Sequence, residues 1–146
     1  MALLTFKGGI HPDDGKRLAK DKAITEVKPK GNLVYPLSQH IGAPAAPVVS
    51  VGDHVLRGQK IAEAGGFVSA PIYASVSGTV KAIEPHFNPT GAKVNCIVVE
   101  NDEQYEEVEY GPVKPLEEMT KEEILNAIGE AGIVGMGGAG FPTRVK

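Results

Sequence analysis

The sequence predicts a mainly β protein that ends in one helix and a glycine-rich loop. Three observations lead to this fold class. Glycine and proline (18 and 11 of 146 residues) supply about a fifth of the chain, and this density of turn formers fits many short strands. Apolar residues alternate through much of residues 51–99. The apolar period lengthens to that of a helix only after two further prolines, in residues 120–131.

Composition limits the class of protein before any motif is considered. The chain is 42% hydrophobic and lacks tryptophan, so we expect an aliphatic core. The net charge is −3, with scattered basic residues, which gives no support for nucleic-acid binding. No stretch approaches the roughly 18 consecutive apolar residues of a transmembrane segment. Cys96 is the single cysteine, which indicates a reducing compartment and cannot supply the roughly four thiolates of an iron–sulfur cluster.

The N-terminal part is expected to contain little regular structure. Residues 1–31 combine the turn-forming FKGGIHP with the polar AKDKAITEVKPKG, and predict an irregular arm that wraps the next domain. Residues 32–50 contain three prolines, which restrict strands there to edges and short pieces.

Residues 51–83 show a pattern of short strands and tight turns. In VGDHVLRGQKIAE, Gly52 and Gly58 lie six residues apart, and each is able to adopt the positive φ of a tight turn. In SAPIYASVSGTVKAIE, alternating apolar residues precede and follow a turn at Ser77-Gly78. The apolar positions of this pattern are Val51, Val55, Ile61, Ile72, Ala74, Val76, Val80, Ala82 and Ile83.

The next segments predict one more internal strand and an exposed one. GAKVNCIVVEN, residues 91–101, forms a strand with Val94, Cys96 and Val98 on one side, so Cys96 is expected to be a buried, unreactive side chain. The acidic EQYEEVEYG that follows is expected to be an edge or exposed strand whose solvated glutamates discourage further pairing.

A helix is expected after Pro112 and Pro115. Thr120 and Glu123 have the spacing of a capping box, in which the Thr120 side chain accepts from the Glu123 amide and Glu123 reaches back. The expected helix ends at Gly132. Its apolar face consists of Ile124, Leu125, Ile128 and Ala131.

The order of turns in residues 51–80 resembles the barrel-sandwich hybrid, the flattened β-barrel of biotinyl and lipoyl carrier domains. Short strands need turns at fixed intervals to keep their inward side chains on one core. The carriers hold their modified lysine at a hairpin tip, which corresponds to Glu63–Val68 in this sequence. No lysine occurs between Lys60 and Lys81, so the resemblance implies the fold and argues against biotin or lipoyl carriage.

The glycine-rich end carries a more specific resemblance. Glycines leave backbone N–H groups unshielded, so that these groups can converge on a phosphate. GMGGAGFPTRVK resembles the flavin and dinucleotide loop of the NADH-binding flavoprotein subunit of respiratory complex I. Together with the motifs that precede it, this loop makes the whole chain resemble the RnfC family, a peripheral component of Rnf electron transport complexes. Those motifs are FKGGIHP (6–12), PLSQHIGAPA (36–45), SVGDHVLRGQ (50–59) and SGTVKAIEPH (77–86).

The RnfC resemblance implies a function that needs more of the subunit than these residues. It implies a peripheral subunit on the cytoplasmic side of the cell membrane, with an FMN- and NADH-binding domain and cysteine motifs for 4Fe-4S clusters. The complex would exchange electrons between ferredoxin and NAD, coupled to Na⁺ or H⁺ movement. The implied partners are the other Rnf subunits, ferredoxin and NADH or NAD. The clusters would lie in a downstream region, and these residues alone are expected to hold neither cofactor nor metal.

The same resemblance assigns cofactor-binding residues to the loop. Two positions depart from the complex I pattern: Met136 replaces an arginine, and is assigned a backbone role only, while Arg144 replaces a glycine. No catalytic residue is assigned. The positions matched to an FMN phosphate or nucleotide are Gly135, Gly137 and Gly138, with Lys146 as the basic partner, and those that would shape the loop are Ala139, Gly140, Phe141 and Thr143.

We therefore expect three parts: an arm (1–31), a barrel-sandwich hybrid domain (32–111), and a linker, helix and glycine-rich start of an incomplete α/β flavin-binding domain (112–146). This part of the oxidoreductase is expected to be structural or docking, and inactive alone. The alternatives are a non-catalytic interaction module and the A subunit of the related Na⁺-translocating NADH:quinone reductase, which the GGAGFPT loop disfavours. The histidines His11, His40, His54 and His86 lack metal-ligand spacing and are expected in turns or on the surface.

Overall fold

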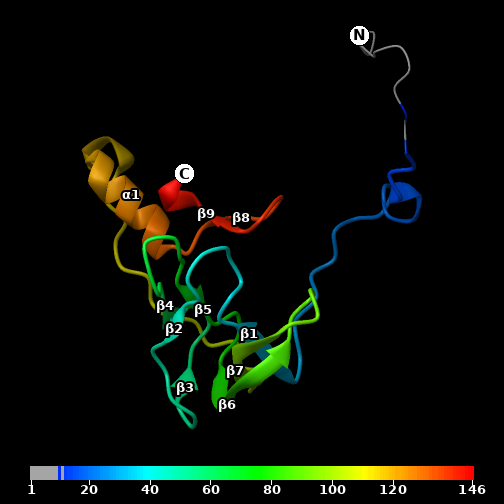
Figure 1. Cartoon of the computed structure of the whole chain (residues 1–146), viewed down its shortest axis with the longest axis horizontal. Helices are drawn as coiled ribbons and strands as arrows, with labels where there is room; N and C mark the ends of the chain where they lie inside the picture. Colours follow the sequence, from blue (N-terminus) through cyan, green and yellow to red (C-terminus); the bar gives the residue numbers. More distant parts are fainter. Residues whose placement is uncertain (1–9, 11) are drawn as a thin grey trace.

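The computed structural model describes residue 10 and residues 12–146. Most of the FKGGIHP motif, including His11, therefore lies outside the described residues. Figure 1 shows the strands of residues 32–101 gathered in one body, with α1 (Lys121–Glu130) and the chain that follows it on one side. The strands are β1 Asn32–Pro36, β2 Ala46–Pro47, β3 His54–Val55, β4 Lys60–Glu63, β5 Ile72–Tyr73, β6 Gly78–Phe87, β7 Lys93–Asn101, β8 Val134–Gly135 and β9 Phe141–Pro142, and the 3₁₀ turns are η1 Lys16–Leu18, η2 Leu116–Glu118 and η3 Thr143–Val145.

Two antiparallel sheets build the barrel. One has the strand order β1-β7-β6-β3 and the other the order β2-β4-β5. The long β6–β7 pair has a register shift between Val80 and Ala82, where a bulge increases the local twist of the strand. The mainly β, barrel-sandwich hybrid fold class predicted from the sequence is confirmed, with one helix after the barrel.

The core lies between the two sheets, and most of the predicted inward residues are in it. Val51 is a wrong prediction, because it lies in the turn before β3 and is 60% exposed. Ile83 is partly exposed, because it follows the bulge and β3 pairs only with the first two residues of β6. The buried cluster contains Tyr35, Leu37, Ala45, Val55, Ile61, Ala62, Ile72, Ala74, Val76, Val80, Ile97 and Val99.

Strand β7 is buried on both faces over residues 96–99. The prediction that Cys96 is buried is confirmed, at 1% exposure. The residues of β7 in the core cluster, however, are Ile97 and Val99, which alternate with the predicted set and so point to the opposite face. Four successive apolar or small residues carry no period-two signal, and the sequence alone could not identify the core-facing side.

The described part of the arm does not wrap the barrel, which corrects the prediction. Residues 12–31 are all exposed, and Figure 1 shows them leading away from the strands. Contact with the barrel is made at the end of the arm, where the Pro29 carbonyl accepts from Asn101 Nδ2 and from the Tyr105 hydroxyl, both at 2.7 Å. The arm is mainly polar, and its apolar side chains Leu18, Ile24 and Val27 stay exposed, so it buries little apolar surface on the barrel.

The acidic segment (residues 102–111) is not a strand, which corrects a second prediction. It forms one isolated parallel bridge, between Arg57 and Glu107. Glu103 and Tyr105 have φ values of 59° and 56°, which no β-strand accommodates. The segment crosses the barrel as an irregular chain, held by Arg57, whose N–H donates to the Glu106 carbonyl at 2.8 Å.

Helix α1 begins at the predicted capping box. The Glu123 N–H donates to Thr120 Oγ1 at 3.2 Å, and the Thr120 N–H donates to Glu123 Oε2 at 2.7 Å. Gly132, with φ of 66°, follows its C-terminal end as expected. None of its ten residues is buried, because the helix contacts the rest of the described chain mainly through η3 and its own C-terminal end.

Candidate functional site

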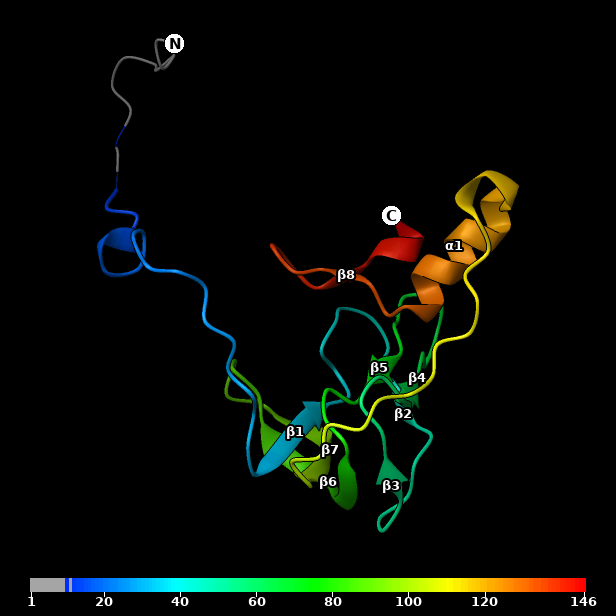
Figure 2. The same cartoon turned by 180° about the vertical axis from the view of Figure 1, so that it is seen from behind.

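The glycine-rich motif folds into a short β-hairpin, the glycine hairpin (residues 134–142). Val134 pairs with Pro142 and Gly135 with Phe141, and the Gly140 N–H donates to the Gly135 carbonyl at 3.2 Å. Gly140 has a φ of 63°, the left-handed conformation that glycine adopts without strain. Figure 2 shows the hairpin on the same side of the barrel as α1.

The tip of this hairpin presents unused backbone donors. The N–H groups of Gly137, Gly138 and Ala139 donate to no atom of the described residues. A Cβ added to either glycine would have no neighbouring atom within 4 Å. Successive exposed N–H groups in a glycine turn are the usual backbone ligands of a phosphate, so the tip fits the phosphate of a nucleotide or flavin.

The remaining predicted site residues lie at or just after the hairpin. Phe141 is half-buried, whereas Thr143 and Lys146 are exposed in and beside η3, where the Lys146 N–H donates to the Thr143 carbonyl. The hairpin thus groups the glycines, and Lys146 follows within one turn. The binding roles assigned to these residues stay a prediction.

Arg144, which departs from the complex I pattern, is used within the chain. Its guanidinium donates to Asn126 Oδ1 at 2.9 Å. Its Cδ would lie 2.6 Å from a Cβ at Gly129, so the absence of a side chain there lets Arg144 lie across α1. Arg144 therefore ties η3 to the helix, a role that the sequence pattern did not indicate.

The hairpin also contacts the barrel, through the loop that joins β1 to β2. The Ile41 N–H donates to the Gly140 carbonyl at 3.2 Å. A Cβ at Gly140 would lie 3.1 Å from the Gln39 carbonyl oxygen and 3.3 Å from the His40 Cα. His40, expected in a turn or on the surface, lies in this loop but is buried, with 8% exposure. Its partner Ala70 is 30 residues away in sequence, so spacing alone could not reveal this burial.

The end of α1 is docked on the β4–β5 part of the barrel. Lys60 forms an ion pair with Glu130, and this hydrogen bond raises the pKa of the lysine. The Tyr73 hydroxyl donates to the Glu130 carbonyl, and partial burial raises the pKa of that phenol. The junction borders an open, mainly apolar cleft of about 600 Å³ and a second cleft of about 240 Å³. Neither of these two clefts is lined by the glycine hairpin.

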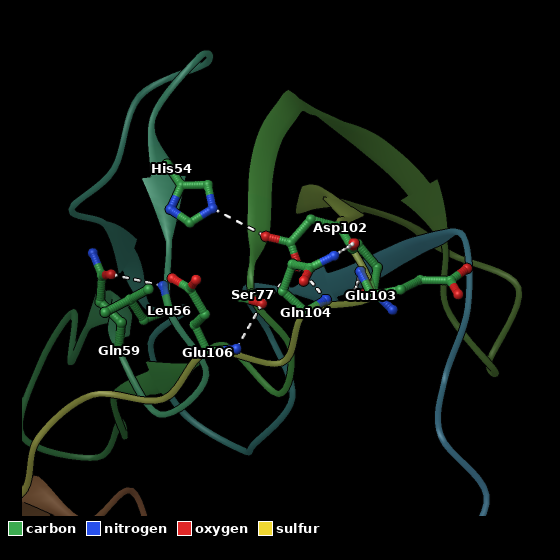
Figure 3. A network of polar contacts seen from close by, with 9 residues as sticks. His54, Leu56, Gln59, Ser77, Asp102, Glu103, Gln104 and Glu106 are labelled. Atoms are coloured by element: carbon green, nitrogen blue, oxygen red, sulfur yellow. Dashed lines mark hydrogen bonds and ion pairs between the residues drawn. The ribbon is translucent and has the colours of Figure 1, made fainter.

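A serine, an aspartate and a histidine meet at one edge of the barrel (Figure 3). The Ser77 hydroxyl donates to Asp102 Oδ1 at 2.7 Å, and His54 Nε2 lies 3.1 Å from Asp102 Oδ2. The carboxylate therefore stands between the other two groups. A nucleophilic serine needs its base on the hydroxyl itself and access to substrate, whereas Ser77 is fully buried.

This cluster is a clamp for the acidic segment. Ser77 Oγ accepts from the Glu106 N–H at 3.0 Å, and Asp102 Oδ1 accepts from the Gln104 N–H at 2.9 Å. The hydroxyl of Ser77 and the Gln104 N–H hold the pKa of the Asp102 carboxyl at about 2, below its ordinary 3.8. The clamp fixes an irregular chain in residues for which the sequence predicts an edge or exposed strand.

We expect this clamp to make stability depend on pH in the acid range. The folded pKa of Asp102 lies below the unfolded one, so its contribution is complete above about pH 5 and is lost as the pH falls toward about 2. Asp102→Asn should therefore flatten the decline of the melting temperature between these pH values. Glu109→Gln, which removes an exposed carboxylate without a hydrogen bond among the described residues, should keep the parent slope. Equal slopes for all three proteins would contradict the assignment.

The described part of the chain contains no helix with the length and apolarity needed to cross a bilayer. The same residues contain no group of three or more His, Cys, Asp or Glu side chains arranged to hold a metal ion.

Comparisons with known proteins agree with the fold and with the motifs. Residues 4–104 match the family described as the RnfC barrel sandwich hybrid domain. The C subunit of the proton-translocating ferredoxin:NAD(+) oxidoreductase complex of Clostridium ljungdahlii is 49% identical over 146 residues, which cover 99% of this chain and 32% of that protein. The C subunit of the Na(+)-translocating ferredoxin:NAD(+) oxidoreductase complex of Acetobacterium woodii is 43% identical over 143 residues, 97% of this chain and 32% of that protein.

A third organism gives the same result. The C subunit of the ion-translocating oxidoreductase complex of Vibrio cholerae is 42% identical over 146 residues, which cover 99% of this chain and 19% of that protein. The chain thus spans about a third of the length of the first two curated relatives and about a fifth of the third. The family match and these identities confirm the resemblance carried by the glycine turns and the C-terminal loop: the chain belongs to the RnfC family.

Proposed function

We propose that this chain contributes a barrel-sandwich hybrid domain and a phosphate-binding hairpin to a peripheral subunit of an ion-translocating ferredoxin:NAD oxidoreductase complex. The names of the Clostridium ljungdahlii and Acetobacterium woodii relatives support this reaction. In the intact subunit, electrons pass between NADH or NAD, FMN and 4Fe-4S clusters, coupled to Na⁺ or H⁺ movement. The subunit lies on the cytoplasmic side of the membrane, against the other subunits of the complex.

One observation carries the cofactor assignment: the free N–H groups at the tip of the glycine hairpin. The amides of Gly137, Gly138 and Ala139 would donate to phosphate oxygens of FMN or of the dinucleotide. Lys146 would add a positive charge one turn later. FMN, when bound, supplies the exchange between two-electron and one-electron carriers, while the chain binds and orients the phosphate. The 4Fe-4S ligands must come from elsewhere in the subunit, because Cys96 is single and buried.

Flavin titration tests this proposal. We expect the intact subunit to bind FMN stoichiometrically, with quenching of flavin fluorescence, because the hairpin then meets the rest of its pocket. The 146-residue chain alone is expected not to retain FMN, because it supplies one edge of the site. Tight stoichiometric binding by these residues alone would contradict an incomplete pocket, and no binding by the intact subunit would contradict the function.

A docking role without cofactor contact is the second candidate, and the exposed arm favours it. Leu18, Ile24 and Val27 are 75%, 102% and 82% exposed, so the arm carries apolar side chains that the barrel does not cover. Replacing all three by serine in the intact subunit should then release it from the membrane fraction while FMN binding persists. Unchanged membrane association would count against this candidate.

A further inference from the structure

His40 occupies a buried position in the loop that joins the first two strands of the barrel. Its Nδ1 lies 3.2 Å from the Ile41 carbonyl oxygen, and its Nε2 accepts from the Ala70 N–H at 3.2 Å. Nε2 also lies 3.1 Å from the Ala70 carbonyl oxygen, so the ring bonds Ala70 in either neutral tautomer. With the proton on Nδ1, the ring donates to the Ile41 carbonyl and Nε2 accepts from the Ala70 N–H; with the proton on Nε2, it donates to the Ala70 carbonyl. The ring thus joins its own loop to Ala70, two residues before β5.

The same loop is fixed at a second point. The Ala43 N–H donates to the Val68 carbonyl at 2.9 Å, and a Cβ at Gly42 would lie 2.0 Å from that oxygen. With His40 on Ala70 and Ala43 on Val68, the loop is held against residues 68–70 on both sides of Ile41. The Ile41 peptide therefore lies between two residues that are hydrogen-bonded to the barrel.

The Ile41 peptide also contacts the glycine hairpin. The Ile41 N–H donates to the Gly140 carbonyl, while the Gly140 N–H donates across the hairpin to the Gly135 carbonyl. Gly140 directly follows the three residues whose N–H groups are free of partners among the described residues. A series of hydrogen bonds thus runs from Ala70 through His40 and Ile41 to the base of the phosphate-binding tip.

We propose that His40 is a positioning residue, which holds the glycine hairpin against the barrel through Ile41 and so orients the N–H groups of residues 137–139 for a phosphate-bearing cofactor. This inference rests on the proposed function. A hairpin fixed before the ligand arrives loses less conformational entropy on binding, so loosening it should weaken the affinity without removing any ligand contact. The barrel then serves as one support of the cofactor site.

The test uses the intact subunit, with hydrogen exchange of residues 134–142 and FMN titration as the two readouts. His40→Ala should speed amide exchange in the hairpin and weaken FMN binding about tenfold, roughly the effect of one hydrogen bond. The side-chain oxygen of His40→Gln is able to accept from the Ala70 N–H. This variant should therefore recover part of the slow amide exchange and part of the FMN affinity. Gly140→Ala should also speed exchange and weaken FMN binding, because its Cβ would press on the Gln39 carbonyl and push the hairpin away from the loop.

Tyr35→Phe is the matched control. It removes a buried hydroxyl that accepts from the Ser75 N–H at 3.1 Å, in the same barrel but away from the hairpin contact. It should lower the melting temperature and leave both readouts unchanged. The inference is overturned if His40→Ala leaves hairpin exchange at the parent rate, or if Tyr35→Phe weakens FMN binding as much. If the parent protein binds no FMN, the proposed function and the ligand part of this inference both fail, and hydrogen exchange alone decides whether His40 anchors the hairpin.

Discussion

Gly78→Ala is expected to lower the free energy of unfolding by about 3 kcal/mol or more, which would leave much of the barrel unfolded at moderate temperature. Gly78 begins β6 and pairs with both neighbouring strands, opposite Val55 and Asn101. Its φ is 153°, and an added Cβ would lie 2.0 Å from the Glu100 carbonyl oxygen. Relief of that overlap requires movement of β6 away from β7, which breaks ladder hydrogen bonds. Urea unfolding followed by circular dichroism measures the loss.

Gly52→Ala is the control that separates overlap from backbone strain. Gly52 also has a positive φ, 97°, but a Cβ there would have no atom within 4 Å. Its alanine variant should lose only about 1–2 kcal/mol, the cost of a left-handed conformation. Equal losses at the two positions would show that contact with the Glu100 carbonyl is not the cause at Gly78.

The barrel interior could largely be predicted because its turns are local. Gly52 and Gly58 lie in turns, and the alternation that follows them identifies Ile61, Val76 and other inward residues. The predicted turn at Ser77-Gly78 is wrong, because Gly78 is the first residue of β6. The acidic segment could not be predicted, because its course depends on the distant Ser77 and Arg57 and not on its own alternation. The buried Ser77 hydroxyl needs hydrogen-bond partners, and it finds them in Asp102 and the Glu106 N–H. These bonds outweigh the weak strand preference of the acidic segment.

In the candidate site, too, the local features could be predicted and the contacts with distant residues could not. The glycine spacing of GMGGAGFPT is a local signal that predicts a loop with unshielded N–H groups. The structure adds that this loop is a hairpin with those groups at its tip. The contact of Gly140 with Ile41 joins residues about 100 positions apart, and the burial of His40 depends on Ala70, 30 positions away. No single-sequence pattern reports either contact. The role of Arg144 could not be predicted for the same reason, since its partner Asn126 lies on the preceding helix.

In the intact subunit, Gly138→Asp is expected to weaken FMN binding about a hundredfold. A carboxylate near a bound phosphate adds repulsion of about 3 kcal/mol at the effective dielectric constant of a protein surface. The fold should not change, because a Cβ at Gly138 has open space and the residue lacks a positive φ. Fluorescence titration with FMN gives the affinity, and thermal unfolding without ligand verifies that the variant is as stable as the parent.

Gly138→Asn separates charge from size, because asparagine has nearly the shape of aspartate without its charge. We expect this variant to weaken FMN binding by less than about tenfold, since the backbone N–H remains and only the approach to it is narrowed. The gap between the two variants should shrink as the salt concentration rises, because salt screens an exposed charge pair. Equal affinities for both variants and the parent would show that no phosphate lies at the tip of the glycine hairpin. Equal losses that do not respond to salt would show that the tip contacts an uncharged part of the ligand.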